Sequence, residues 1–188
     1  LKDNINTMIG NLRLTTERNT EQDWLKTHLA RFTSMLQGQR DLATVGTLLL
    51  SELVPLVSAH QGMIYGYDKE RGHLRLLAKY AGDFRNPIPT ELPLGDGFVG
   101  QCAVDRRPVV LADIPEDAIR INTVMFEAVP RSMVTFPVIF EDELKAVIAL
   151  ASLNEFEPAH LAFLGQLTEG IGIVLNSIEA TMQTEGLL

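Results

Sequence analysis

Hydrophobic residues are sparse in the first 40 positions of the chain and recur three and four residues apart. They form two series, Ile5, Met8 and Leu12, then Leu25, Leu29, Phe32 and Leu36. The spacing predicts a long helix with a narrow apolar stripe, which suits the seam between two helices better than a globular core. We therefore expect this helix to pair with a second copy of the chain, although a frayed lead-in would give a similar pattern. A polar run from 15 to 22 separates the series, which do not share one heptad register, and this predicts a phase break.

The pattern changes at Leu42, where a wide apolar face extends to about position 60 and predicts a buried helix. Positions 62–68 and 73–81 then indicate two short strands joined by a polar turn. A second pair of strands, 131–140 and 144–153, is joined by an acidic turn, and Pro137 should mark an edge, a bulge or a strand end. From Pro158, which suits a first helical turn, three-four spacing continues almost to the end of the chain.

The order of helix, strands, connecting segment, strands and helix predicts an α+β fold with one antiparallel sheet and helices gathered on one face. We divide the chain into a helical lead-in at 1–41, a globular domain with its final helix at 42–182, and a tail at 183–188.

Three glycines, Gly95, Gly97 and Gly100, have the G-x-G-x-x-G spacing of a dinucleotide site. Such a site also needs a full crossover helix and a parallel strand beyond it. Here the helix can run only over 97–105 before Pro108 ends it and a strand begins. The glycines are therefore interpreted as structural, with Gly95 and Gly97 forming a tight turn and Gly100 allowing close packing. Phe98, Val99 and Cys102 are expected to point inward.

The composition of the chain excludes several classes of function. The 188 residues carry a formal net charge of -8, which disfavours binding to nucleic acid or an anionic membrane surface. The single cysteine, Cys102, excludes an internal disulfide and suits a reducing compartment. No run approaches the roughly 20 apolar residues of a membrane helix. The four histidines are scattered without metal-ligand spacing, and no nucleophile motif such as G-x-S-x-G is present.

Specific stretches resemble the GAF family. "LPLGDGFVGQCAVDRRPVVLADI" (92–114) is similar to the family's glycine turn, short helix and following strand. "RSMVTFPVIFEDELKAVIALAS" (131–152) resembles its closing hairpin, and "LTEGIGIVLNSIEA" (167–180) its final helix. The resemblance covers about 42–180. The N-terminal "LKDNINTMIGNL" resembles the second helix of a HAMP linker, and the whole order is similar to hybrid sensor histidine kinases with repeated HAMP units.

The resemblance implies a sheet of five or six antiparallel strands, with ligands bound on the face away from the main helices. No cofactor is expected, because the chain lacks the family's cyclic-nucleotide motif, a bilin-type cysteine in the 113–131 segment and an evident haem ligand. A small-ligand pocket is the remaining possibility, and a dry core the alternative. By position, its candidate residues are Tyr65, Phe84, Phe98, Ile114, Val124, Phe126, Met133 and Thr135.

The resemblance implies a bacterial, cytoplasmic sensory GAF module that passes a conformational signal from HAMP units to a downstream kinase in a two-component phosphorelay. The fragment itself is not expected to be an enzyme, although its parent chain would be an ATP-dependent protein histidine kinase. We expect a parallel homodimer with no direct membrane contact, forming a bundle of the first and last helices. Its expected interface is Leu25, Leu29, Phe32, Leu36, Leu164, Ile171 and Ile178. The alternatives are a reductase of the free methionine-sulfoxide type, which relies on several cysteines, and a ligand-free dimerisation spacer.

Overall fold

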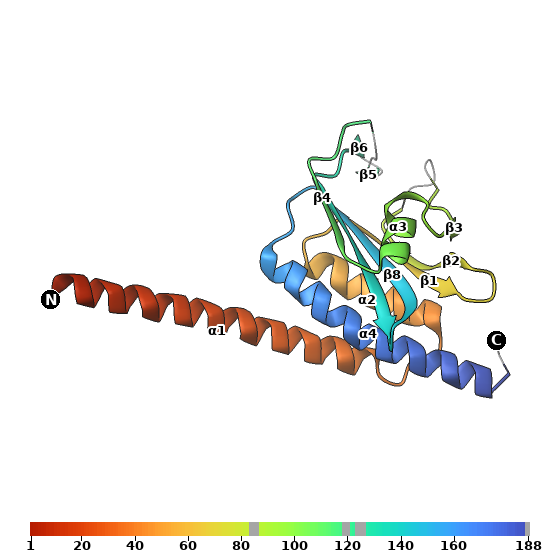
Figure 1. Cartoon of the computed structure of the whole chain (residues 1–188), viewed down its shortest axis with the longest axis horizontal. Helices are drawn as coiled ribbons and strands as arrows, with labels where there is room; N and C mark the ends of the chain where they lie inside the picture. The colour runs from red at the N-terminus through yellow and green to blue at the C-terminus, as the bar shows by residue number, and fades with distance from the viewer. Residues whose placement is uncertain (83–86, 118–120, 123–126, 187–188) are drawn as a thin grey trace.

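The computed structural model describes residues 1–82, 87–117, 121–122 and 127–186. A long helix, α1 (Lys2–Leu36), leads into α2 (Leu42–Leu56). A sheet and the long final helix α4 (Pro158–Thr184) complete the body, and α1 extends well beyond it (Figure 1). The long helix predicted for the lead-in is present and the alternative of a frayed segment is not, because α1 is one continuous helix of 35 residues.

The main sheet has six strands in the order β3-β2-β1-β8-β7-β4, and every neighbouring pair is antiparallel. Its strands are β1 (Gln61–Asp68), β2 (His73–Tyr80), β3 (Glu91–Pro93), β4 (Val109–Ala112), β7 (Ser132–Phe140) and β8 (Glu143–Ser152). Two short strands, β5 (Ile121–Asn122) and β6 (Glu127–Ala128), pair separately. The α+β fold with an antiparallel sheet of five or six strands is thereby confirmed. The strands on either side of the glycine turn, β3 and β4, lie at opposite edges of the sheet and each pairs antiparallel with its neighbour. This excludes the parallel strands of a dinucleotide-binding site around Gly95.

Pro137 lies where the sequence predicts. β4 pairs with β7 only over Ser132–Thr135, so β7 has a free edge from Phe136 onward. The register between β7 and β8 shifts immediately afterwards, between Val138 and Ile139. A proline is tolerated at such a position because no ladder hydrogen bond is lost.

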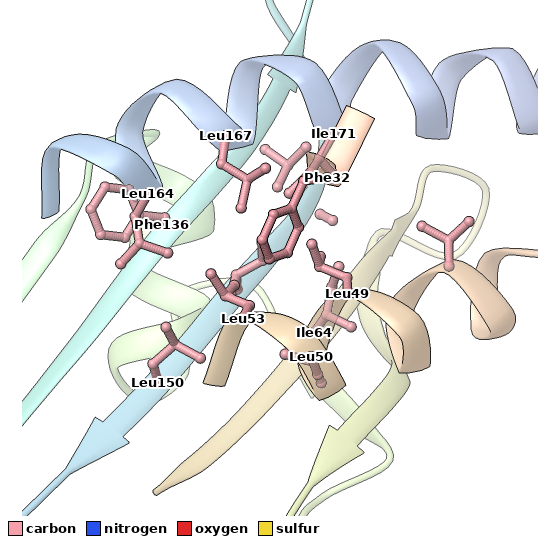
Figure 2. Packing of buried hydrophobic residues seen from close by; sticks show 14 of the residues in the cluster. Phe32, Leu49, Leu50, Leu53, Ile64, Phe136, Leu150, Leu164, Leu167 and Ile171 are labelled. Carbon is pink, nitrogen blue, oxygen red and sulfur yellow. The ribbon is translucent and has the colours of Figure 1, made fainter. Parts of the chain in front are cut away.

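The larger hydrophobic core lies between the sheet and three helices, α1, α2 and α4. Figure 2 shows Phe32 of α1 among Leu167 and Ile171 of α4 and Leu49 and Leu53 of α2. From the sheet, Ile64, Phe136 and Leu150 point into the same cluster. The second half of α1 is therefore part of the domain core, although the sequence places it in a separate lead-in.

The expected dimer interface is corrected by this packing. Phe32, Leu36, Leu164, Ile171 and Ile178 are all buried within one chain, and Leu25 and Leu29 pack against the same cluster. Their three-four spacing does mark a helix–helix seam, but the seam joins α1 to the chain's own α4. The five buried side chains are therefore already covered within one chain.

Aromatic rings join α1 to the start of α4. Trp24 lies 4.6 Å from His28, 5.6 Å from His160 and 5.4 Å from Phe163, between ring centroids. Phe32 packs edge-on against Phe163 at 5.5 Å. Because Trp24, His28 and Phe32 follow one another at four-residue intervals, they occupy one side of α1 and fix its position on α4.

The first 22 residues of α1, Lys2–Asp23, are exposed throughout. Ile5, Met8 and Leu12 retain 52, 63 and 65% of their accessible surface. The two apolar series thus serve different purposes: the second is covered by α2 and α4, and no described residue covers the first. At 100° per residue the mean directions of the two series lie about 120° apart around the helix, which accounts for the predicted phase break.

α4 is long and apolar enough, by length and composition alone, to cross a membrane, with a mean hydropathy of 1.4 over its best 18-residue window. The search for an uninterrupted apolar run did not predict this, because polar residues are interspersed along α4. In the structure 44% of the window is buried inside the chain, against β7 and α1. A core helix passes the same test of composition, so the hydropathy of α4 is explained by its packing.

Asp41 caps the N-terminus of α2. Its carboxylate accepts hydrogen bonds from the Thr44 backbone N–H at 2.8 Å and the Thr44 hydroxyl at 2.7 Å. The Thr44 side chain first, and its backbone N–H second, lower the pKa of Asp41 below its usual 3.8. The folded state therefore favours the ionised carboxylate. The cap's contribution is complete above the ordinary pKa and is lost as the pH falls through the lowered folded value.

We expect Asp41→Ala to reduce the free energy of unfolding by about 1 kcal/mol at pH 7. The deficit should shrink below about pH 4, because the wild-type carboxylate is then protonated as well. Urea titrations at pH 7, 5 and 3 measure it. Asp41→Asn is the matched control, since asparagine caps a helix without titrating, and its own stability should show no such pH dependence. A deficit that stays constant down to pH 3 would contradict the assignment.

Candidate ligand-binding face

The opposite face of the sheet has its own, smaller core. Side chains alternate along each strand, so Tyr65, Leu74 and Val147 point away from α2 and α4. They meet the short helix α3 (Gly97–Asp105), which contributes Cys102 and Ala103. The expectation that all helices lie on one face therefore needs one addition, because α3 covers the second face. The uninterrupted apolar run of β8 was the available signal, since a strand buried on both faces reads this way.

The glycine turn positions α3 over this face. Gly95 and Gly97 have φ values of +83° and +59°, in the left-handed region that glycine adopts readily. Gly100 allows a close approach of backbones, because a Cβ there would lie 2.7 Å from the Pro93 carbonyl oxygen. The structure thus uses the three glycines to fold α3 back onto the end of β3.

Tyr65 is fully buried beneath the second face. Its hydroxyl donates a 2.7 Å hydrogen bond to the Pro89 carbonyl oxygen, which holds the segment before β3 against the sheet. Burial raises the pKa of Tyr65 to about 12, so the phenol stays protonated at physiological pH. In this position Tyr65 supports the wall of a pocket and supplies no acid or base.

Cys102 and Thr135 form the polar part of this face. The Cys102 thiol donates to the Arg107 carbonyl oxygen at 3.3 Å, and burial raises the thiol pKa above its usual 9.0. The Thr135 hydroxyl lies near the thiol and partly opposes that rise in pKa. The contact does not have the geometry of a hydrogen bond, and Thr135 Oγ1 has no hydrogen-bond partner among the described residues. Thr135 is only 2% exposed. A buried hydroxyl without a partner is costly, and a polar ligand atom could satisfy it.

We expect the Cys102 thiol to react with Ellman's reagent at least about a hundred times more slowly in the native protein than in 6 M guanidinium. Both its burial and its raised pKa reduce the accessible thiolate. Absorbance at pH 8 measures the rate, and the denatured sample is the control. Rapid reaction of the native thiol would show that α3 opens readily.

The structure separates the candidate pocket residues. Tyr65 and Thr135 are buried on the second face, whereas Met133 and Ile114 are only half-buried. Phe84, Val124 and Phe126 lie outside the described residues. Phe98 is corrected: it is 45% exposed on the outer side of α3. Because the helix starts at Gly97, its period directs Val99, Cys102 and Ala103 inward instead.

Groups of three or more His, Cys, Asp or Glu side chains that could hold a metal are not found among the described residues. The second face is thus an apolar surface with one thiol and one unpaired hydroxyl. Such a surface suits a small, mostly apolar ligand with a single polar group.

A six-stranded antiparallel sheet with three helices on one face and a short helix closing the other defines a class of α+β domain. The chain belongs to the GAF domain family, whose profile matches residues 39–176. A search of curated proteins gives no significant match.

Several solved structures share the fold at low sequence identity. The GAF domain of a phosphoenolpyruvate-protein phosphotransferase from Coxiella burnetii has a TM-score of 0.68 at 20% identity and covers 87% of this chain and 97% of its own. Free methionine-R-sulfoxide reductase from Neisseria meningitidis gives 0.65 at 18%, with 81 and 89% covered. Residues 122 to 287 of a methyl-accepting chemotaxis protein give 0.63 at 20%, with 80 and 98% covered. At these identities the likeness establishes the fold alone.

Proposed function

We propose that this chain is the sensory GAF module of a two-component sensor histidine kinase. It receives a conformational state from HAMP units through α1, modifies it in the GAF body, and passes it through α4 to a kinase core. The module acts in the cytoplasm as a parallel homodimer and catalyses no reaction itself. The observation that carries this proposal is α1, a continuous helix whose second half is built into the core and whose first half carries an apolar stripe with no cover among the described residues.

An uncovered helix of this kind is marginal in water, because its stability normally comes from packing an apolar face. Ile5, Met8 and Leu12 fall at a, d and a of a heptad repeat. In the same register Asn19 falls at the next a position, where a buried asparagine favours two strands in fixed register. Arg18 and Asp23 fall at g and e, the positions that pair across a parallel dimer. These assignments support a second copy as the partner of α1.

Light scattering at tens of micromolar tests the dimer. The wild-type chain should have twice its 20.8 kDa mass, and Leu12→Glu should be monomeric, because a charge at a buried a position opposes pairing. Leu14→Glu is the matched control: Leu14 is also exposed on α1, but lies outside the a and d positions and should leave the dimer intact. A monomeric wild-type chain would contradict this part of the proposal.

Kinase control needs its own experiment. The chain is placed between a HAMP unit and a histidine-kinase core, and autophosphorylation is measured with labelled ATP. We expect Leu12→Glu to reduce the rate at least about ten-fold, with little effect of Leu14→Glu, because kinase control depends on the paired helices. Equal rates in all three chimaeras would refute a transmitting role for α1.

Ligand sensing is the second part of the proposal and is supported by the unpaired Thr135 hydroxyl beneath α3. Native mass spectrometry of freshly purified protein tests it, and an additional small-molecule mass abolished by Thr135→Val is the expected result. If no such mass is found, the chain is better described as a dimerisation spacer.

The reductase alternative has one observation in its favour, the fold shared with free methionine-R-sulfoxide reductase. Cys102 is a poor nucleophile for that chemistry, because burial keeps its thiol protonated. We expect no reduction of methionine sulfoxide by the chain with dithiothreitol as reductant. Turnover that is lost in Cys102→Ser would instead establish an enzyme.

A further inference from the structure

The tip of the β7–β8 hairpin, residues 139–145, lies between the two helical layers of the domain. α3 packs on β7 and β8 from the second face, and α4 packs on them from the first. Both helices also hold this hairpin tip by specific polar or backbone contacts. The hairpin tip therefore contacts both the ligand face and α4.

On the α3 side the connection is Arg106, the residue that ends the helix. Its backbone N–H closes the last turn on the Cys102 carbonyl oxygen. Its guanidinium donates a 2.5 Å hydrogen bond to the Asp142 carbonyl oxygen in the turn of the hairpin. A displacement of α3 therefore acts directly on the backbone of the turn.

On the α4 side the connection is Lys145, near the start of β8. Its ammonium lies 3.0 Å from a Glu179 carboxylate oxygen on α4 and 3.5 Å from Glu143. The Lys145 side chain is 10% exposed and that of Glu179 26%. A partly buried pair of this kind resists separation more than a surface pair does, because each charge would be left poorly solvated. Glu143 also accepts from Lys69 at 3.0 Å, which ties the β1–β2 turn to the same tip.

The turn itself is under backbone strain. Glu141 and Asp142 form the two-residue loop of the hairpin, with φ values of +47° and +64°. Such loops favour asparagine and glycine, which enter the left-handed region at little cost. Contacts from both sides hold the turn in this conformation, so the loss of either contact would release part of its strain.

We propose that the hairpin tip is a mechanical link that carries displacements of α3 on the ligand face to α4. Only the biological role of the link rests on the proposed function: a ligand bound under α3 would act on α4, the proposed output helix, through the hairpin tip. Arg106 and Lys145 are its two attachment points.

Hydrogen exchange of the full chain, followed by mass spectrometry, tests the link without a ligand or a kinase. Arg106→Met should raise the exchange rate of α4 amides in 174–182 by about three-fold or more, because one support of the tip is lost. Amides of α2 in 45–54 should not change. In a Lys145→Met background, Arg106→Met should have no further effect on α4, because the path is already broken.

Arg107→Met is the matched control, since the Arg107 side chain makes no hydrogen bond or ion pair with another described residue, and it should leave α4 unchanged. The proposal is overturned if Arg106→Met does not affect α4, if the two substitutions act independently, or if α2 accelerates equally, which would indicate general destabilisation. A chain that is monomeric or binds no ligand would contradict the proposed function, but the hydrogen-exchange results expected for the mechanical link would be unchanged.

Discussion

Phe163→Ala is expected to reduce the free energy of unfolding by about 3–5 kcal/mol, the largest effect of any single change considered for this chain. Phe163 is fully buried and lies against Trp24, His28 and Phe32 of α1. Truncation leaves a cavity where α1 meets α4, and the lost edge-on aromatic contacts add to the cost. Urea titration measures the loss. Trp24, the single tryptophan, should also shift its emission to longer wavelength as α1 loosens.

Phe98→Ala is the control for this experiment, because it removes the same side chain from an exposed position on α3. Its effect should stay within about 0.5 kcal/mol. If the two alanine variants were equally stable, α1 would not be held on α4 in the way the structure shows. If Phe98→Ala were the more damaging, Phe98 would be buried by something beyond the described residues.

The second large effect is expected at Gly172, where α4 crosses β7. A Cβ at this position would lie 2.6 Å from the Ile139 carbonyl oxygen and 3.2 Å from the carbonyl carbon. Backbone cannot rotate away as a flexible side chain can, so Gly172→Ala must push α4 off the sheet. We expect a loss of about 1–3 kcal/mol in a thermal or urea unfolding experiment.

Gly170→Ala on the same helix should have the opposite sign. Nothing lies within 4 Å of the corresponding Cβ, so the only change is the better helix propensity of alanine. A gain of about 0.5–1 kcal/mol is expected. A loss at both positions would mean that the outer side of α4 is covered in solution, for instance by a second copy.

The sequence was sufficient for the elements and the fold, because each strand pair and helix carries its own period. The β1–β2 and β7–β8 hairpins, the free edge at Pro137 and the start of α4 at Pro158 all follow from local chemistry. The partner of each apolar stripe was not predictable in this way. The spacing of Leu25, Leu29 and Phe32 shows that one face of the helix is buried. The same spacing is found whether that face packs on a helix of the same chain or on a helix of another chain.

The candidate site was predicted less well. Tyr65 and Thr135 do share the second face, because alternation along a strand determines which side chains share a face, but no observation tests whether they line a pocket. Phe98 was misplaced, since the inward side of α3 depends on where the helix begins. The unpaired state of the Thr135 hydroxyl depends on distances to Cys102 and the rest of the face, which no sequence pattern encodes.

The unbroken form of α1 also makes it a lever. Its first 22 residues, Lys2–Asp23, are exposed throughout and reach about 33 Å along the helix axis from the point where Trp24 meets α4. A tilt of about 10° at that fulcrum would move the N-terminal end sideways by about 6 Å. Rearrangements of side chains around Trp24 and Phe163 too small to disturb the sheet would thus become displacements of several ångströms at the far end of the rod.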